Sequence, residues 1–408
     1  MMLKIVLCCL AALQFSKASL VVNLESYSSS VPTKINNVLD GSKLYLASSD
    51  SLDALGKITV SSNGQTKTLN QLLNDVDAKG YLNGFPVNSD LTIATTNSGQ
   101  VTDLLNGYLF ISSPDMVKDP NFLVYMLSGQ GKTIERSNNL ETTLVILNTR
   151  VEKSANDPDT KPYYSTTLEK INQSKSSVLY LYQGVPGDGY TDPTYQESYQ
   201  KVMFQNPIEL YPTGQPTREK VFFNTIEPIQ YTLRTWYIRA VGGGISFDIS
   251  QKWKDTKTIQ TTNETTTGFI MSQHNTYSYN VMYKNTPGHD GISGYMVSTS
   301  DMASDMNVVL CNEINCEAHT FLKTQPVSAD FFQYSRNDTT LKVNVAQIAD
   351  FGNFYLQFYR IEGAASTGGV VSSTVAPVTS TNAPETTTKS VAGLSVIGAL
   401  VVMIKSML

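Results

Sequence analysis

Residues that could perform enzymatic chemistry form no recognisable catalytic motif in this chain, and its numerous carboxylates are scattered. Its three histidines, His274, His289 and His319, form neither an HExxH pattern nor a pair at metal-ligand spacing. The segment 128–133 (SGQGKT) resembles the end of a phosphate-binding loop, but Met126 stands where that loop requires its first glycine. We therefore predict no catalytic residue, no metal site and no cofactor.

Tyrosines are the strongest remaining signal for binding. Exposed aromatic rings with polar neighbours are typical of surfaces that recognise sugars or proteins. Five tyrosines lie in one short interval rich in turn residues: Tyr180, Tyr182, Tyr190, Tyr195 and Tyr199. They are candidate ligand-binding residues. The alternative is that they belong to the core, because Tyr180 and Tyr182 share one face of a candidate strand.

Cysteine usage agrees with export from the cell. Cys8 and Cys9 lie in an N-terminal segment that we expect to be removed, which leaves Cys311 and Cys316. Their spacing suits a disulfide across a tight β-turn. Two isolated thiols cannot complete a tetrahedral zinc site unless histidines arrive from elsewhere.

Three sequons for N-glycosylation point to the same compartment. They begin at Asn172, Asn263 and Asn337. A glycan on any of them requires that the asparagine face solvent.

Both ends of the chain carry export signals. Residues 1–18 have a positive Lys4, a short apolar run and small residues before a cleavage site at Ala18, as in a secretory signal peptide. The other end has an apolar tail in 391–408, a polar spacer before it and small residues near Ser380. This order indicates a GPI-attachment signal with Ser380 as the preferred site, and a short membrane helix is the alternative.

The segment before the tail favours a stalk. Residues 363–390 are almost all Gly, Ala, Ser, Thr, Val and Pro. Such a composition buries little apolar surface and is typical of an O-glycosylated spacer.

Composition limits the classes of partner. The 408 residues include 41% hydrophobic and 16% charged residues, with a net charge of −5 and a pI near 5.3. Apolar residues suffice for folded cores, while no basic region exists to hold a nucleic acid backbone. The expected partners are a membrane, reached through a lipid anchor, and an extracellular glycan or protein ligand.

Short alternating segments predict an all-β fold. Apolar residues recur at every second position in 245–249, 277–283, 341–345 and 354–359, a period that places them on one face of a sheet. Similar segments include 43–47, 108–112, 122–127, 143–148 and 178–183. One helix is expected at 68–78. A polar stretch at 151–177 predicts a linker between a sandwich domain at 19–150 and a second sandwich region at 178–362.

These features together resemble the CUB-like domain proteins expanded in nematodes, many of which are induced by infection or stress. The resemblance rests on GYLFISS near Tyr108, NFLVYMLS near Phe122, the 308–316 segment and the strand at 354–359. It implies two or more tandem β-sandwich domains, an extracellular location, and a role in defence without enzymatic activity. CUB domains usually carry disulfides, whereas residues 19–150 contain no cysteine.

The sequence therefore predicts a non-enzymatic, GPI-anchored surface glycoprotein that acts in recognition or protection during innate immune or stress responses. Two alternatives remain open. One is a secreted hydrolase that acts on glycans through dispersed carboxylates. The other is a passive coat protein.

Overall fold

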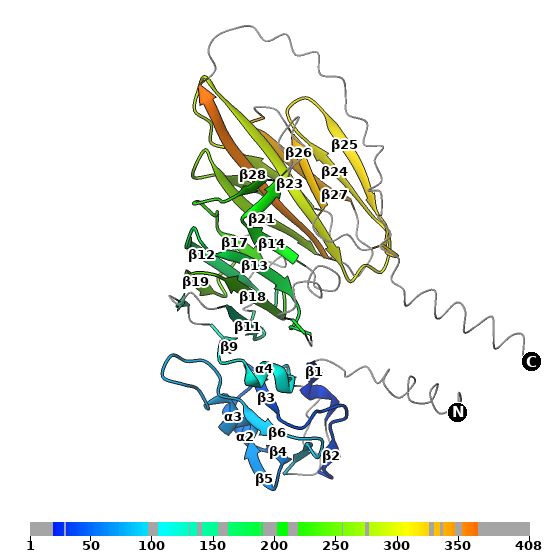
Figure 1. Ribbon diagram of the computed structural model, residues 1–408. Helices are drawn as coiled ribbons and strands as arrows, with labels where there is room; N and C mark the ends of the chain where they lie inside the picture. The colour runs from blue at the N-terminus through cyan, green and yellow to red at the C-terminus, as the bar shows by residue number, and fades with distance from the viewer. Residues whose placement is uncertain are drawn as a thin grey trace, which may run out of the picture. The chain divides into compact units, whose positions relative to one another are not determined.

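The computed structural model (Figure 1) describes most of the chain before residue 366. The described ranges are 19–27, 30–96, 105–129, 131–136, 141–153, 162–187, 189–190, 202–210, 219–254, 256–273, 277–325, 330–334, 338–346 and 353–365. The chain divides into Met1–Ala365 and Ser366–Leu408, and every described residue lies in the first unit.

The N-terminal part folds into two antiparallel sheets that share a core. One sheet has the order β1-β8-β3-β6, formed by Leu20–Asn23, Tyr108–Ile111, Ser42–Ala47 and Phe85–Val87. The other has the order β2-β7-β4-β5, formed by Thr33–Lys34, Thr92–Thr95, Ile58–Ser62 and Gln65–Thr68. Leu44, Leu46 and Val60 lie in the core between these sheets. The opposite face of β3 is also buried, since Tyr45 and Ala47 pack into a second core.

The N-terminal part also contains short helices. They are the 3-10 helix Leu24–Ser26, α2 (Leu52–Gly56), α3 (Leu69–Leu73) and α4 (Pro114–Lys118). Helix α3 begins with a capping box, in which Thr68 and Gln71 bond each other's backbone amides. The helix expected at 68–78 therefore exists, but it ends at Leu73, where Asn74 caps it with side-chain and backbone bonds to the carbonyl of Asn70.

Two further sheets occupy the middle of the chain. One has the order β14-β13-β18-β11-β9, formed by Val202–Asn206, Val178–Gln183, Thr235–Val241, Thr142–Asn148 and Phe122–Leu127. The other has the order β10-β19-β12-β17, formed by Lys132–Arg136, Ile245–Ser250, Thr166–Gln173 and Ile229–Tyr231. Trp236, Ile146 and Phe247 meet in the core that these sheets share. Strands β9 and β11 run parallel, while the other pairs in these sheets are antiparallel.

The C-terminal part again pairs two sheets. One has the order β20-β22-β27-β24-β25, formed by Thr258–Gln260, Tyr277–Met282, Thr340–Ala346, Met306–Cys311 and Cys316–Phe321. The other has the order β21-β28-β23-β26, formed by Thr266–Gln273, Asn353–Ala365, His289–Ser300 and Asp330–Tyr334. Figure 1 shows the long strands β23 and β28 side by side, as their register requires. A two-stranded sheet of β15 (Ile208–Leu210) and β16 (Glu219–Val221) completes the described strands.

The all-β prediction is confirmed, and several alternating segments form the expected strands. Strand β19 buries Ile245, Phe247 and Ile249 and leaves the residues between them half-buried. Strand β28 differs from the expectation of one buried face, because both of its faces are covered. Phe354 packs into the C-terminal core, whereas Tyr355 packs into the middle core.

The stretch expected to be a linker contains β12. Threonines give this strand its polar composition, yet Thr166 and Thr167 are buried where β12 pairs with β17 and β19. Threonine is β-branched and suits a strand as well as an apolar residue of similar shape. The strands β9 and β11, expected in a domain at 19–150, pair within a sheet that also contains β13, β14 and β18.

Candidate functional site

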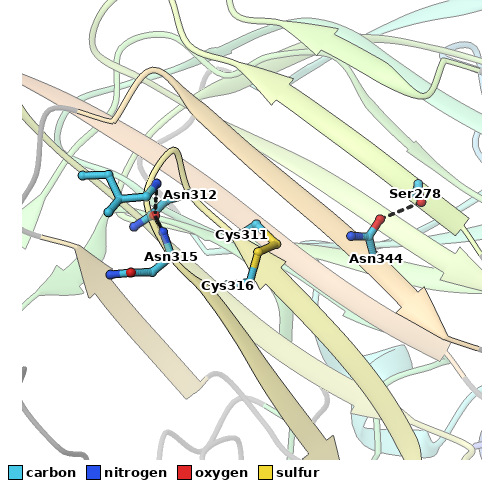
Figure 2. The surroundings of a disulfide bond; sticks show 7 residues. Ser278, Cys311, Asn312, Asn315, Cys316 and Asn344 are labelled. Atoms are coloured by element: carbon cyan, nitrogen blue, oxygen red, sulfur yellow. Dashed lines mark hydrogen bonds between the residues drawn. A yellow bond between two sulfur atoms is a disulfide. The ribbon is translucent and has the colours of Figure 1, made fainter.

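The disulfide lies at the turn of a hairpin in the C-terminal sheet. Cys311 ends β24, Cys316 begins β25, and the two are directly paired across the strands with a Cα–Cα distance of 4.0 Å. Figure 2 shows Asn312 turning its side chain toward the loop, where its Oδ1 accepts bonds from the amides of Ile314 (2.9 Å) and Asn315 (2.7 Å). The turn is thus fixed by the covalent bond and by a polar side chain.

The tip of this hairpin presents an apolar residue to solvent. The side chain of Ile314 is 66% exposed. Beside it, Glu313 accepts bonds from the backbone and the hydroxyl of Thr339, which holds the pKa of Glu313 below its usual range. The sequence predicted the bridge but gave no indication of the exposed isoleucine.

Two of the tyrosines expected at a binding surface are buried instead. Tyr182 stacks on Tyr237 with ring centroids 4.7 Å apart. Tyr190 donates a hydrogen bond of 2.7 Å from its hydroxyl to Asp119 Oδ2 and packs edge-on against Phe122. Burial raises the pKa of both hydroxyls. These rings fill the core between neighbouring sheets, so they cannot also contact a ligand.

The other three tyrosines of that group are placed differently. Tyr180 is half-buried beside Tyr182. Tyr195 and Tyr199 lie outside the described residues. Of the three described tyrosines, Tyr182 and Tyr190 therefore do not belong to an exposed binding surface.

Two of the three sequon asparagines face solvent. Asn172 lies in β12 and Asn263 lies between β20 and β21, and both side chains are exposed. The Oδ1 atom of Asn263 accepts a hydrogen bond of 3.3 Å from the amide of Thr265. This bond does not use the Nδ2 atom, to which a glycan would be attached. Both positions meet the steric condition for a glycan. Asn337 lies outside the described residues, as do Ser380, the signal segment 1–18 and the tail 391–408.

Metal-ligating residues do not gather in the part of the chain that the structure describes. No group of three or more His, Cys, Asp or Glu residues there has the geometry to hold a metal ion. His289 lies 3.5 Å from Glu362, and His319 lies 3.6 Å from Glu317.

A polar cleft of about 570 Å³ is the candidate binding site. Three parts of the chain form its walls: the loop after β3, Asn106, and the segment after β11. The lining residues are Ser49, Asp50, Ser51, Asn106, Arg150, Val151, Glu152, Lys153 and Tyr163. We call this set the basic–tyrosine cleft.

Asp50 fixes one wall of the cleft. Its carboxylate accepts bonds from the backbone amides of Asn106 (3.1 and 3.2 Å) and Gly107 (3.0 Å), and from the hydroxyl of Ser48 (2.5 Å). Through these bonds Asp50 holds the loops of the cleft together.

Two cations of the cleft lie against the ring of Tyr163. The guanidinium carbon of Arg150 lies 4.1 Å from the ring centroid of Tyr163, and Lys153 Nζ lies 4.3 Å from it. The ring is 45% exposed. A bond of 2.7 Å from the amide of Val151 to the carbonyl of Tyr163 ties the two segments together.

Sequence reasoning missed this cleft. Arg150 directly precedes the stretch expected to be a linker, and Tyr163 lies within it. The serines, Asn106 and Arg150 come from segments far apart in the chain. The only local signal is the combination of an aromatic ring with basic residues in 150–163.

Among the described residues, no helix combines the length and the apolar composition needed to cross a bilayer.

Solved structures similar to this chain are distant ones. An insecticidal delta-endotoxin, Cry8Ea1 of Bacillus thuringiensis, matches 47% of this chain and 43% of its own length, with 9% identity and a TM-score of 0.18. The CUB1-EGF-CUB2 region of human MASP-1/3 matches 57% of this chain and 99% of its own length, with 7% identity and a TM-score of 0.19. At these TM-scores neither likeness carries an inference about this chain.

The match to a protein family covers most of the chain. No curated protein matches the sequence. Residues 39–405 match the family described as "Transmembrane glycoprotein", a range that includes all three sequons, the disulfide and most of the apolar tail. The chain therefore belongs to the transmembrane glycoprotein family.

Proposed function

We propose that this chain is a non-enzymatic glycoprotein of the extracellular face of the plasma membrane, held there by a lipid anchor near Ser380. Its strand-built body presents loops and the basic–tyrosine cleft to extracellular ligands, in a recognition or protective role during innate immune or stress responses. CUB-like architecture of the sandwich regions is part of the same proposal.

The observation that carries the proposal is the exposure of Asn172 and Asn263 on a disulfide-containing all-β body. Glycans and disulfides both form in the secretory pathway. Membership of the transmembrane glycoprotein family supports a location at a membrane surface. The small residues, polar spacer and apolar tail of 380–404 support lipid attachment rather than a spanning helix.

Treatment of intact expressing cells with phosphatidylinositol-specific phospholipase C tests the anchor. We expect the chain to appear in the medium, because the enzyme cleaves the lipid and leaves the protein intact. A matched variant in which 391–408 is replaced by a membrane helix about 20 residues long should stay on the cells. Retention of the natural chain alongside release of a known lipid-anchored control would contradict the proposal.

A recognition role is tested separately from attachment. The full chain, purified from secretory cells in mild detergent, should bind saturably to microbial cells or to arrayed glycans. Blank results on both would favour a passive coat protein.

A further inference from the structure

The basic–tyrosine cleft contains two cations held against one aromatic ring. Arg150 and Lys153 both lie within cation–π distance of Tyr163. In the part of the chain that the structure describes, neither cation forms an ion pair with a carboxylate, and Arg150 donates to the neutral side-chain oxygen of Asn106. Because each cation lies about 4 Å from the same ring centroid, the two like charges are at most about 8 Å apart, and a bound anion would relieve their repulsion.

Two carboxylates, those of Asp50 and Glu152, also line the cleft, but among the described residues neither forms an ion pair with Arg150 or Lys153. The carboxylate of Asp50 is turned to the backbone amides of Asn106 and Gly107 and to the hydroxyl of Ser48. Glu152 is exposed on the cleft and forms no ion pair among the described residues. It would repel an anion and therefore provides a test of the charge of the ligand.

The remaining lining suits hydroxyl groups. Ser51 caps helix α2 by accepting from Ala54, and Ser49 donates 3.0 Å to the carbonyl of Arg150. Each serine oxygen retains further hydrogen-bonding capacity on an exposed side chain. A volume of about 570 Å³ falls within the range of small-molecule sites, roughly 300–1,000 Å³.

We propose that the basic–tyrosine cleft binds an acidic saccharide, whose carboxylate or sulfate groups contact Arg150 and Lys153 and whose hydroxyls contact the serines and Asn106. This inference rests on the proposed recognition role and names its site and ligand class. A charge-assisted hydrogen bond to each cation would provide both affinity and selection against neutral sugars.

The experiment measures binding of the full chain, in mild detergent, to a heparin-derived sulfated tetrasaccharide by titration calorimetry. Neutral chitotetraose and an acidic peptide serve as comparison ligands. We expect the sulfated sugar to bind, with an affinity that falls as salt is added because the charges become screened. Equal or tighter binding of the neutral sugar or the peptide would overturn the ligand class, while leaving the wider recognition role standing.

Substitutions in the cleft test whether the saccharide binds there. Lys153→Gln and Arg150→Gln should each weaken binding about 10-fold, as the loss of one charge-assisted bond implies. Glu152→Gln should strengthen binding about 2-fold to 5-fold by removing a repulsion. Lys118→Gln, an exposed lysine that pairs with Asp115 away from the cleft, should leave affinity unchanged.

Lys153→Gln and Glu152→Gln change exposed or half-buried groups, so they preserve the fold even where Arg150→Gln disturbs it. No change in affinity for either of them would overturn the assignment to this cleft. Absence of any binding by the sulfated sugar would do the same, and the phospholipase experiment would still report separately on the surface anchor.

Discussion

Gly268 of β21 lies opposite Phe358 of β28, and the aromatic ring covers the space that a side chain would need. A Cβ atom on Gly268 would overlap the ring of Phe358. We therefore expect Gly268→Ala to lower the free energy of unfolding by about 1–3 kcal/mol, the usual cost of overpacking a core.

The matched control is Gly56→Ala at the end of α2, where nothing lies within 4 Å of the new Cβ. That variant should keep or slightly raise stability, by up to about 1 kcal/mol, because alanine is the better helix residue. Urea unfolding of both variants makes the comparison, and equal effects would show that Phe358 does not occupy the space above Gly268.

Buried tyrosines make stability depend on alkaline pH. Burial raises the pKa of Tyr45 to about 12, an effect that a hydrogen bond from Ser112 partly offsets. Burial likewise raises the pKa of Tyr108 and Tyr231 well above the ordinary value. In the unfolded chain these hydroxyls ionise near pH 10. Above that pH the unfolded state binds fewer protons than the folded state, so stability falls as pH rises toward the folded pKa values.

Urea unfolding measured from about pH 8 to about pH 11 checks this dependence. Tyr45→Phe should reduce the alkaline loss of stability, because that position can no longer ionise in the unfolded chain. A stability that stays constant or rises through this range would contradict the burial of the tyrosines.

At the scale of elements, the β24–β25 hairpin is closed by a bridge across six residues. The chain-entropy model gives about 2 kcal/mol for a loop of this length. We expect the double variant Cys311→Ser with Cys316→Ser to lose about that much stability and to become insensitive to dithiothreitol. The natural chain should lose the same amount when reduced. Sensitivity of the double variant to reductant would show that the stabilisation does not come from this bridge.

Particular strands show how far local patterning predicts this fold. Strand β19 follows the alternation of its residues because one of its faces is only half-buried. Strand β28 shows the same pattern but lies between two cores, where even the polar Gln357 is fully buried and exchanges bonds with the backbone of Gln205 in β14. Burial of the second face depends on which sheet packs there, and local sequence does not contain that information.

Across the whole molecule, the sheets of the first 250 residues share cores. Tyr108 of β8 donates from its hydroxyl to the carbonyls of Asn148 (3.1 Å) and Arg234 (2.8 Å), and its ring lies 4.0 Å from the guanidinium of Arg234. Tyr182 and Phe110 belong to the same buried cluster. Tyr182 and Tyr190, which the sequence offered as ligand contacts, therefore help to join sheets.

The cleft could not be predicted for a related reason. Ser49, Asn106 and Tyr163 come together only when the N-terminal sheet packs near the end of β11. By contrast, the cysteine pair is separated by only four residues, so spacing alone predicted where a bridge could form. A site within one short segment can be predicted from the spacing of its residues, whereas a site built from three distant loops cannot.

Peptide mapping by mass spectrometry of the mature protein, purified from the surface of expressing cells, tests the central claim most directly. We predict an N-terminus at Ser19, glycans on Asn172 and Asn263, a Cys311–Cys316 disulfide and a lipid-bearing C-terminal peptide that ends near Ser380. Material that retains Met1 and Leu408, carries unmodified asparagines and contains free thiols would contradict the assignment of this chain as an anchored extracellular glycoprotein.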